Sequence, residues 1–180
     1  MTSSESEADD VYGRLIDAGK EDQHDLQGWV ESYVDHEIDF LRAGALRTLA
    51  FHWRLPQYRS LAADRLRSDP SDEVRQTAAM GLGAYGWEAF SAGDMSLLVE
   101  VALDQNVADI VRAAAFTAAL VASRIPREQY PMARQLPDFE ARAPWQLVAQ
   151  ALERVGLPSP PRLRELLAER GDGPGNQSAP

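Results

Sequence analysis

The stretch Asp69-Pro-Ser-Asp-Glu-Val-Arg75-Gln-Thr-Ala-Ala-Met-Gly-Leu-Gly decides the fold of this 180-residue chain. It opens with the turn residues Asp69-Pro-Ser, and apolar residues at helical spacing follow from Val74. Asp72 lies in the first turn of that helix, where a carboxylate interacts favourably with the helix dipole. The stretch therefore predicts a short turn followed by an amphipathic helix.

The same pattern occurs three times along the chain. Segments 39–42, 72–75 and 109–112 share the order Asp, any residue, Leu or Val, Arg, and an Ala follows three positions after each Arg. The arginines are 33 and 37 residues apart, and another apolar segment ends nine residues before each of them. A period of this length with two helices per unit predicts an α-solenoid, in which each unit stacks on its neighbours.

These units resemble HEAT repeats, in particular the short bacterial units similar to the phycobilisome-lyase HEAT-like repeats. The segment 69–83 carries the resemblance best, and it extends over roughly residues 26–125. The resemblance implies an all-α fold, a right-handed α-solenoid of three to four HEAT-like helix pairs with disordered termini.

One solenoid is expected over residues 10–170, with residues 10–18 closing its N-terminal end. Residues 1–9 and 171–180 lack apolar residues at a spacing that would stabilise a fold, so both are expected to be disordered. In the last unit Pro144 lies where the second helix begins, a position that the first helical turn tolerates. The expected helix pairs are 26–57, 58–90, 95–125 and a degenerate 128–156, followed by a closing helix at 161–170.

The negative charge of the chain is concentrated near its N-terminus. Residues 1–40 contain twelve acidic and two basic residues, whereas residues 41–180 contain sixteen of each. An acidic segment repels nucleic acid and anionic lipid and attracts basic protein surfaces. No apolar run approaches the roughly 20 residues of a membrane helix. With no cysteine and no signal-peptide pattern in residues 1–10, the expected compartment is the cytoplasm, and neither nucleic acid nor a membrane is an expected partner.

His36-Glu37 is the pair that invites a metal interpretation, since HEAT-like deoxyhypusine hydroxylases hold two irons with several His-Glu pairs. This chain has one such pair and three histidines in all, too few for a site that needs at least three protein ligands. It also lacks a Gly-rich phosphate loop and a nucleophile motif. We therefore expect no catalytic, cofactor-binding or metal-binding residues, and no cofactor. A lyase-like or hydroxylase-like role is the least favoured alternative.

Each repeated Arg is expected on the buried side of its helix. Apolar residues stand one position before each Arg and three, four and seven positions after it. At 100° per residue around the helix, the mean direction of these side chains lies within about 20° of the Arg side chain. A buried guanidinium has to be paired, and the Asp of the preceding turn is the expected partner. The resulting ladder is expected to pair Asp35 with Arg42, Asp69 with Arg75, and Asp104 with Arg112.

The opposite side of the second helices is too apolar for an ordinary solvated surface. Positions five, nine and twelve after each Arg point away from the core, and the HEAT resemblance places them on the concave surface. Residues 113–123 carry no charge, so a helix over them is uncharged on every side. The outer surface of such a helix is normally buried against other protein surface. The cover is either the segment 126–170, a partner protein or a second copy of the chain. We call these nine residues the strip: Arg47, Phe51, Arg54, Met80, Ala84, Trp87, Thr117, Val121 and Arg124.

The predicted function is non-catalytic protein binding, as a scaffold or adaptor that uses the strip. The aromatic side chains of Trp87, Tyr85 and Phe90 either anchor a partner protein or pack into the space between neighbouring repeat units. The charge of residues 1–40 favours a basic partner protein, and a homo-oligomer is left open. The alternative is a bacterial immunity-type inhibitor of a basic toxin domain, with the acidic region steering association.

Overall fold

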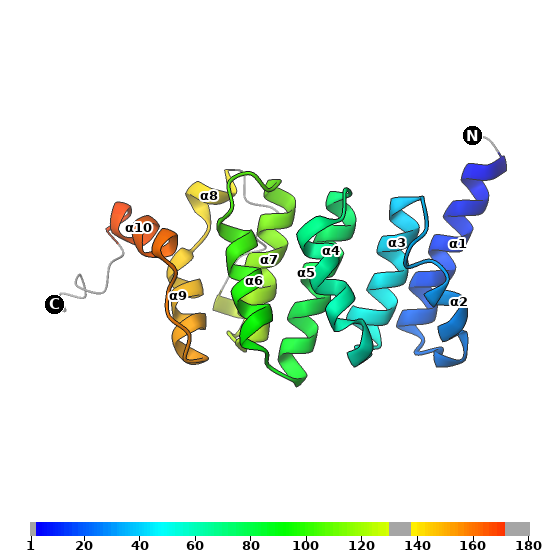
Figure 1. Cartoon of the computed structure of the whole chain (residues 1–180), viewed down its shortest axis with the longest axis horizontal. Helices are drawn as coiled ribbons and strands as arrows, with labels where there is room; N and C mark the ends of the chain where they lie inside the picture. The colour runs from blue at the N-terminus through cyan, green and yellow to red at the C-terminus, as the bar shows by residue number, and fades with distance from the viewer. Residues whose placement is uncertain (1–2, 130–137, 172–180) are drawn as a thin grey trace.

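The structure, a computed structural model, describes residues 3–129 and 138–171. It is an α-solenoid in which helices stack side by side along the long axis of the molecule, with the termini at opposite ends (Figure 1). None of the residues in these two ranges lies in a β-strand. The expected tail beyond Gly171 and residues 130–137 of the expected fourth unit lie outside the described residues.

Three regular helix pairs form the middle of the array. In Figure 1 the first helices α4 (Arg59–Ser68) and α6 (Ala92–Leu103) lie in front of the second helices α5 (Asp72–Glu88) and α7 (Asp109–Ala122). The connecting 3₁₀ turns are η1 (His24–Leu26), η3 (Pro56–Tyr58) and η4 (Arg127–Gln129). The pairs are α2 (Gln27–Glu31) with α3 (Asp39–Leu46) and its π-helical continuation η2 (Arg47–His52), α4 (Arg59–Ser68) with α5 (Asp72–Glu88), and α6 (Ala92–Leu103) with α7 (Asp109–Ala122).

The N-terminal end of the array is closed by α1 (Ser3–Lys20), which packs on α3 and η2. Of the segment 1–9 that was expected to be disordered, residues 1–2 lie outside the described residues and residues 3–9 belong to α1. The apolar stripe of this helix begins at Ala8, which packs against the same cluster as Leu15. The hydroxyl of Thr48 in η2 donates a hydrogen bond of 2.6 Å to the carbonyl of Leu15. Acidic residues near the start also suit the helix dipole.

The C-terminal end consists of α8 (Phe139–Arg142), α9 (Trp145–Arg154) and α10 (Pro161–Glu169). Pro144 separates α8 from α9 and fills the N-cap position of α9. Phe116 of α7, Phe139 and Trp145 are fully buried and meet edge to face, with ring centroids 5.5–5.8 Å apart. This aromatic cluster joins the irregular last unit to the regular repeats.

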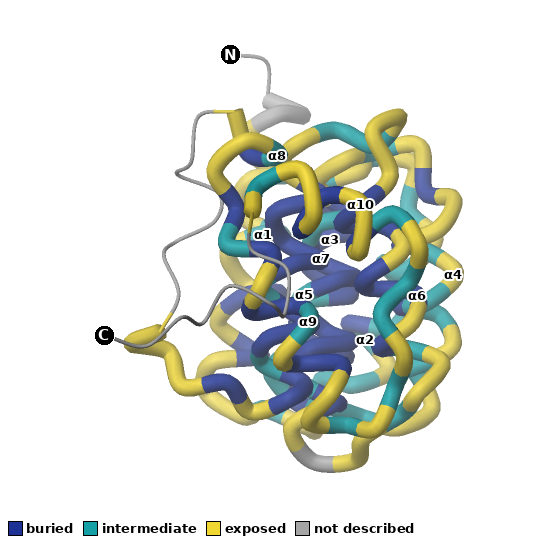
Figure 2. The backbone as a smooth tube through the Cα atoms, turned by 90° about the vertical axis from the view of Figure 1, so that its left-hand side faces the viewer, coloured by how far each residue is buried: buried dark blue, intermediate teal, exposed yellow. Residues whose placement is uncertain are grey.

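The core runs along the second helices. Turned by 90°, the molecule shows its buried backbone gathered in the centre, over α3, α5, α7 and α9 (Figure 2). The helices α5 and α7 approach each other closely, and a Cβ added at Gly86 would lie 2.4 Å from the Cβ of Ala122. A Cβ added at Gly83 would lie 2.9 Å from the Cα of Ala118. Glycine at these two positions therefore sets the spacing of the two helices.

Candidate functional site

The ladder joins neighbouring units, and it does so with different pairs from those expected. Arg42 of the first unit forms a two-pronged ion pair with Asp69 of the second, at 2.9 Å from Nη2 and 3.3 Å from Nε. Arg65 of α4 also contacts Asp69, at 3.3 Å. The carboxylate of Asp69 is fully buried, and it accepts a further hydrogen bond from the backbone amide of Ser71.

Burial raises the pKa of the Asp69 carboxyl, but its hydrogen bonds from Arg42 and Ser71 and the charges of Arg42 and Arg65 lower it by more. The net result is a pKa below the ordinary value. Asp69 is therefore ionised at neutral pH, and its charge is compensated by two arginines from two different helices.

The pairings predicted from the sequence are wrong in each unit. Asp35 is 81% exposed and pairs with Arg65, while Asp104 is exposed and accepts hydrogen bonds from Asn106. Arg75 makes a long ion pair of 3.8 Å with Asp72. The turn from Asp104 to the third motif is two residues longer than the turn from Asp69 to the second, so the two aspartates are not equivalent in space.

The three arginines of the ladder share a different contact, made within their own units. Nε of Arg75 donates to the carbonyl of Leu66 at 3.1 Å, and Nε of Arg112 donates to that of Ala102 at 3.2 Å. Arg42 donates to the carbonyls of His36 and Glu37 in the turn after α2. Each Arg therefore satisfies carbonyl oxygens left open at the end of the first helix of its unit or in the following turn.

Arg112 is 4% exposed and links the third unit to the fourth. It forms an ion pair of 2.8 Å with Glu140 and one of 3.1 Å with Asp109. Burial raises the pKa of Glu140, but hydrogen bonds from Arg112, Gln105 and Arg162 together with the charge of Arg112 lower it by more, so this pKa is lowered overall. Glu140 is therefore the carboxylate partner of Arg112 that was expected at Asp104, and it comes from the next unit.

All nine strip residues keep some exposure to solvent. Arg124 is exposed and Trp87 is 52% exposed, while the other seven are partly buried. Trp87 lies on α5, whereas Arg47 and Phe51 lie on the π-helical segment η2. The hydroxyl of Thr117 donates to the carbonyl of Ala113, so it is satisfied within α7. The described residues leave the strip as a surface of apolar and basic side chains.

Two strip residues occupy unusual backbone conformations at the ends of second helices. Arg54 and Arg124 have φ angles of 50° and 58°, in the left-handed region that favours glycine. Gly156, with φ of 72°, has the same place after α9. The three sequences Arg54-Leu-Pro, Arg124-Ile-Pro and Gly156-Leu-Pro form a repeated helix-ending motif. The recurrence of Leu or Ile before Pro is the sequence signal for these helix ends, and it is not among the expectations above.

Arg124 joins Trp87 to the fourth unit. Its Nη2 donates to the carbonyl of Trp87 at 2.9 Å, and its guanidinium carbon lies 5.4 Å from the centre of the Trp87 ring. Nη1 of Arg154, at the end of α9, donates in turn to the carbonyl of Arg124 at 2.8 Å. Beside them is a hollow of about 290 Å³ whose lining includes Gly86, Phe90, Ala122, Arg124, Arg154 and Val155.

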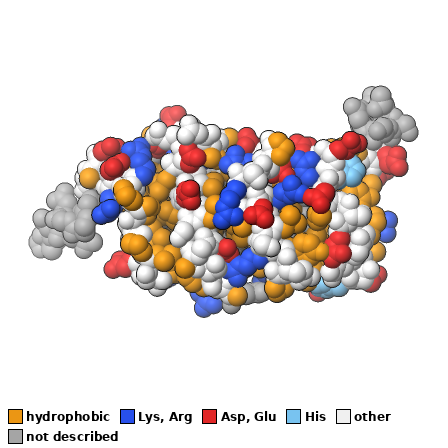
Figure 3. Space-filling view, viewed as in Figure 1, with side chains coloured by type: hydrophobic (Ala, Val, Ile, Leu, Met, Phe, Trp, Pro, Cys, Tyr) orange, Lys and Arg blue, Asp and Glu red, His pale blue; other side chains and the backbone are white. Residues whose placement is uncertain are grey.

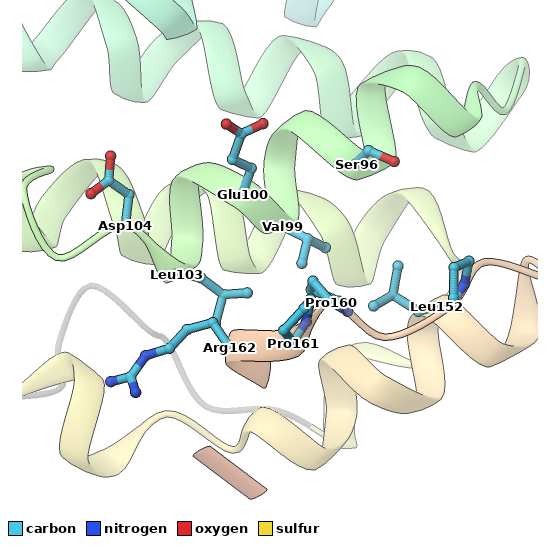
Figure 4. A pocket seen from close by; sticks show the side chains of 10 residues that line it. Ser96, Val99, Glu100, Leu103, Asp104, Leu152, Pro160, Pro161 and Arg162 are labelled. Carbon is cyan, nitrogen blue, oxygen red and sulfur yellow. The ribbon is translucent and has the colours of Figure 1, made fainter. Parts of the chain in front are cut away.

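A larger groove lies between α6 and the α9–α10 segment, on the face of the molecule that Figure 3 shows. Figure 3 shows apolar side chains gathered over the α6 and α9–α10 end of that face. The groove has a volume of about 610 Å³, and Val99 and Leu103 of α6 point across it toward Pro160 and Pro161 (Figure 4). The carboxylates of Glu100 and Asp104 point away from these prolines and give the groove an acidic rim.

The comparison with protein families agrees with this architecture. A family model described as HEAT repeats matches residues 26–120, more than half of the chain. The chain belongs to the HEAT repeat family. Searches of curated proteins and of solved structures found no significant match. The likeness to phycobilisome-lyase repeats in particular stays a prediction.

In this HEAT solenoid, His36 and Glu37 belong to the turn before α3. Nδ1 of His36 accepts a hydrogen bond of 3.1 Å from the amide of Ile38, so it stabilises that turn. Within residues 3–129 and 138–171, no three His, Asp or Glu residues are grouped so that they could hold a metal ion. No helix in these ranges combines the length and the apolar character needed to cross a membrane.

Proposed function

We propose that this HEAT protein binds another protein through the strip and serves as a non-catalytic scaffold or adaptor. The observation that carries the proposal is the exposed side chain of Trp87, which lies among partly buried apolar residues and arginines. Trp and Arg are the residue types that most often dominate the affinity of protein interfaces. Solenoid repeats also present extended surfaces of this kind to partners.

Three neighbouring units contribute to the strip, so a partner would contact the array across its repeats. Met80, Ala84 and Trp87 supply the middle of this surface from α5. The ion pairs of the ladder and the close contact of α5 with α7 fix the spacing of the units. The strip is therefore presented by a rigid support, which reduces the entropy that binding would cost.

The test compares what the parent and a strip variant retain from a lysate of the native host. The variant combines Trp87→Ala with Met80→Ala, and Ile110→Ala is the matched control because Ile110 is 47% exposed outside the strip. A partner retained by the parent and by the control should be lost from the strip variant. With the purified partner, the variant should dissociate faster and bind more weakly by at least about 2 kcal/mol.

Circular dichroism of each variant checks that its fold is retained. If the strip variant retains the same proteins with the same affinity as the parent, the binding surface lies elsewhere and the proposal is wrong. If Ile110→Ala loses the partner as well, the effect does not belong to the strip.

A second candidate function, an immunity-type inhibitor of a basic toxin domain in the cytoplasm, rests on the N-terminal charge. Asp9, Asp10, Asp17, Glu21, Asp22 and Asp25 are all exposed on or just after α1. Exposed charges of one sign raise association rates with an oppositely charged partner, and salt screens them. Replacing these six by Asn and Gln should slow association at low salt and leave dissociation almost unchanged. An unchanged association rate would remove the support for this candidate.

A further inference from the structure

We propose that the ends of α5, α7 and α9 form a docking site for an acidic segment of a partner protein. Asp or Glu carboxylates of that segment would bind Arg124 and Arg154, and a neighbouring apolar side chain would enter the hollow beside them. This inference rests on the proposed function and names the chemistry of the partner at one end of the strip.

Both arginines are held in place before any partner arrives. Arg124 is held by its hydrogen bond to the carbonyl of Trp87 and by a cation–π contact of its guanidinium with the Trp87 ring. Arg154 is fixed by its hydrogen bond to the carbonyl of Arg124. Each of these contacts uses one nitrogen of the guanidinium, and a guanidinium has five N–H donors. Donors on both side chains therefore stay available to a carboxylate.

The positive charge of this pair is not neutralised within the described part of the chain. No ion pair joins Arg124 or Arg154 to a carboxylate of residues 3–129 or 138–171 whose side chain is described. Arg112, by contrast, is paired with Glu140 and Asp109. Carboxylates are strong acceptors for guanidinium groups, with charge-assisted and often two-pronged hydrogen bonds. The complementary ligand is therefore an acidic side chain.

The backbone at Arg124 supports a role for its side chain. A left-handed conformation at the end of a helix favours glycine, and Gly156 fills the equivalent position one unit later. Arg124 has the same conformation with a long side chain, which costs the fold some stability. Unfavourable backbone conformations of this kind cluster at functional sites.

The apolar part of the site makes a protein segment the better ligand than a nucleic acid. Trp87 and Phe90 are 52% and 43% exposed, and the hollow between the helix ends has room for a side chain at about 290 Å³. Nucleic-acid binding depends on many phosphate contacts, and this site offers two arginines, Arg124 and Arg154. Two arginines beside an apolar hollow match a short acidic stretch with an aliphatic or aromatic residue.

The test is the selection of random twelve-residue peptides, displayed on phage, on the immobilised full-length protein. We expect the enriched peptides to contain two or more Asp or Glu residues next to a large apolar residue. A synthetic peptide of the enriched sequence should lose at least ten-fold in affinity when Arg124→Asn is combined with Arg154→Gln. Asn tolerates the left-handed backbone, so this variant removes the charge without forcing a new conformation.

The matched control combines Arg67→Gln with Arg164→Gln, which changes the net charge equally at exposed positions on α4 and α10. Its affinity for the peptide should stay within two-fold of the parent. Enrichment of basic or uncharged peptides, no enrichment at all, or equal losses in both double variants would overturn the inference.

The variant Trp87→Ala separates this inference from the proposed function. Enriched peptides that need Trp87 but are not acidic would contradict the docking of carboxylates and support the strip as a binding surface. Peptides whose binding depends neither on Trp87 nor on Arg124 and Arg154 would contradict both.

Discussion

Arg42 and Asp69 belong to different repeat units, 27 positions apart in the sequence, and form a buried two-pronged ion pair. The pair fixes the first unit against the second, while Arg112 and Glu140 do the same for the third and fourth. The array is therefore held together by charge pairs between units as well as by its apolar core.

Arg42→Ala should destabilise the fold by about 3 kcal/mol, because removal of one partner leaves a buried charge without full compensation. Arg75→Ala should cost only about 1 kcal/mol, since Arg75 mainly donates a hydrogen bond to Leu66. Urea unfolding of both variants and the parent measures the difference. Equal losses in the two variants would show that the inter-unit pair is not the stronger link.

Stability should fall as the pH falls below about 4, the ordinary range of Asp and Glu. The pKa values of Asp69 and Glu140 are lowered in the folded protein, so the unfolded chain takes up these protons at a higher pH. The stabilisation that these two carboxylates give is thus complete above their pKa in the unfolded chain. It is lost as the pH drops through their lower pKa in the folded protein.

Unfolding free energies measured between pH 6 and pH 3 test this assignment. Asp69→Asn should be less stable than the parent at pH 6, and its stability should decline less steeply with falling pH. The same steepness in the variant and the parent would mean that Asp69 does not contribute to the acid sensitivity.

Gly86→Ala should destabilise the protein by about 1–3 kcal/mol, because the new methyl group would collide with Ala122 across the α5–α7 contact. The control is Gly13→Ala on α1, where nothing lies within 4 Å of the added Cβ. That change should stabilise the helix by up to about 1 kcal/mol. Thermal unfolding of both variants should show shifts of opposite sign, and shifts of the same sign would contradict the packing described.

Trp145→Ala should cost about 3–5 kcal/mol, since the indole is fully buried against Phe116 and Phe139. Its Nε1 also donates to the carbonyl of Glu140 at 3.0 Å. Chemical denaturation would measure the loss. A loss under about 1 kcal/mol would show that the last unit does not pack on the repeats as described.

The solenoid itself could be predicted from the sequence because its signals are local. The spacing of Arg42, Arg75 and Arg112, the turn residues before them and the apolar positions around them all lie within single units. The placement of Arg112 on the buried side of its helix agrees with its exposure of 4%. Periodicity is sufficient for such features, since a helix repeats its faces at a fixed angle.

The partners of these arginines could not be predicted from the sequence, since they depend on how one unit is placed against the next. Arg42 reaches Asp69 across the unit boundary, and Glu140 replaces Asp104 because the turn that carries Asp104 is longer. The π-helical segment η2 also changes the angular spacing between Arg47 and Phe51. The contacts that join Trp87, Arg124 and Arg154 involve three different units, so they form only when those units are stacked.

The most direct test of protein binding through the strip is photo-crosslinking in the cells that make the protein. A photoreactive benzoylphenylalanine at Phe51 replaces one aromatic side chain of the strip with another, and the same residue at Arg164 reports on the exposed surface of α10. If the strip binds a partner, position 51 should give a covalent adduct with that protein, the adduct should be lost when Trp87→Ala is added, and position 164 should give none. No adduct from position 51, or equal adducts from both positions, would contradict binding through the strip.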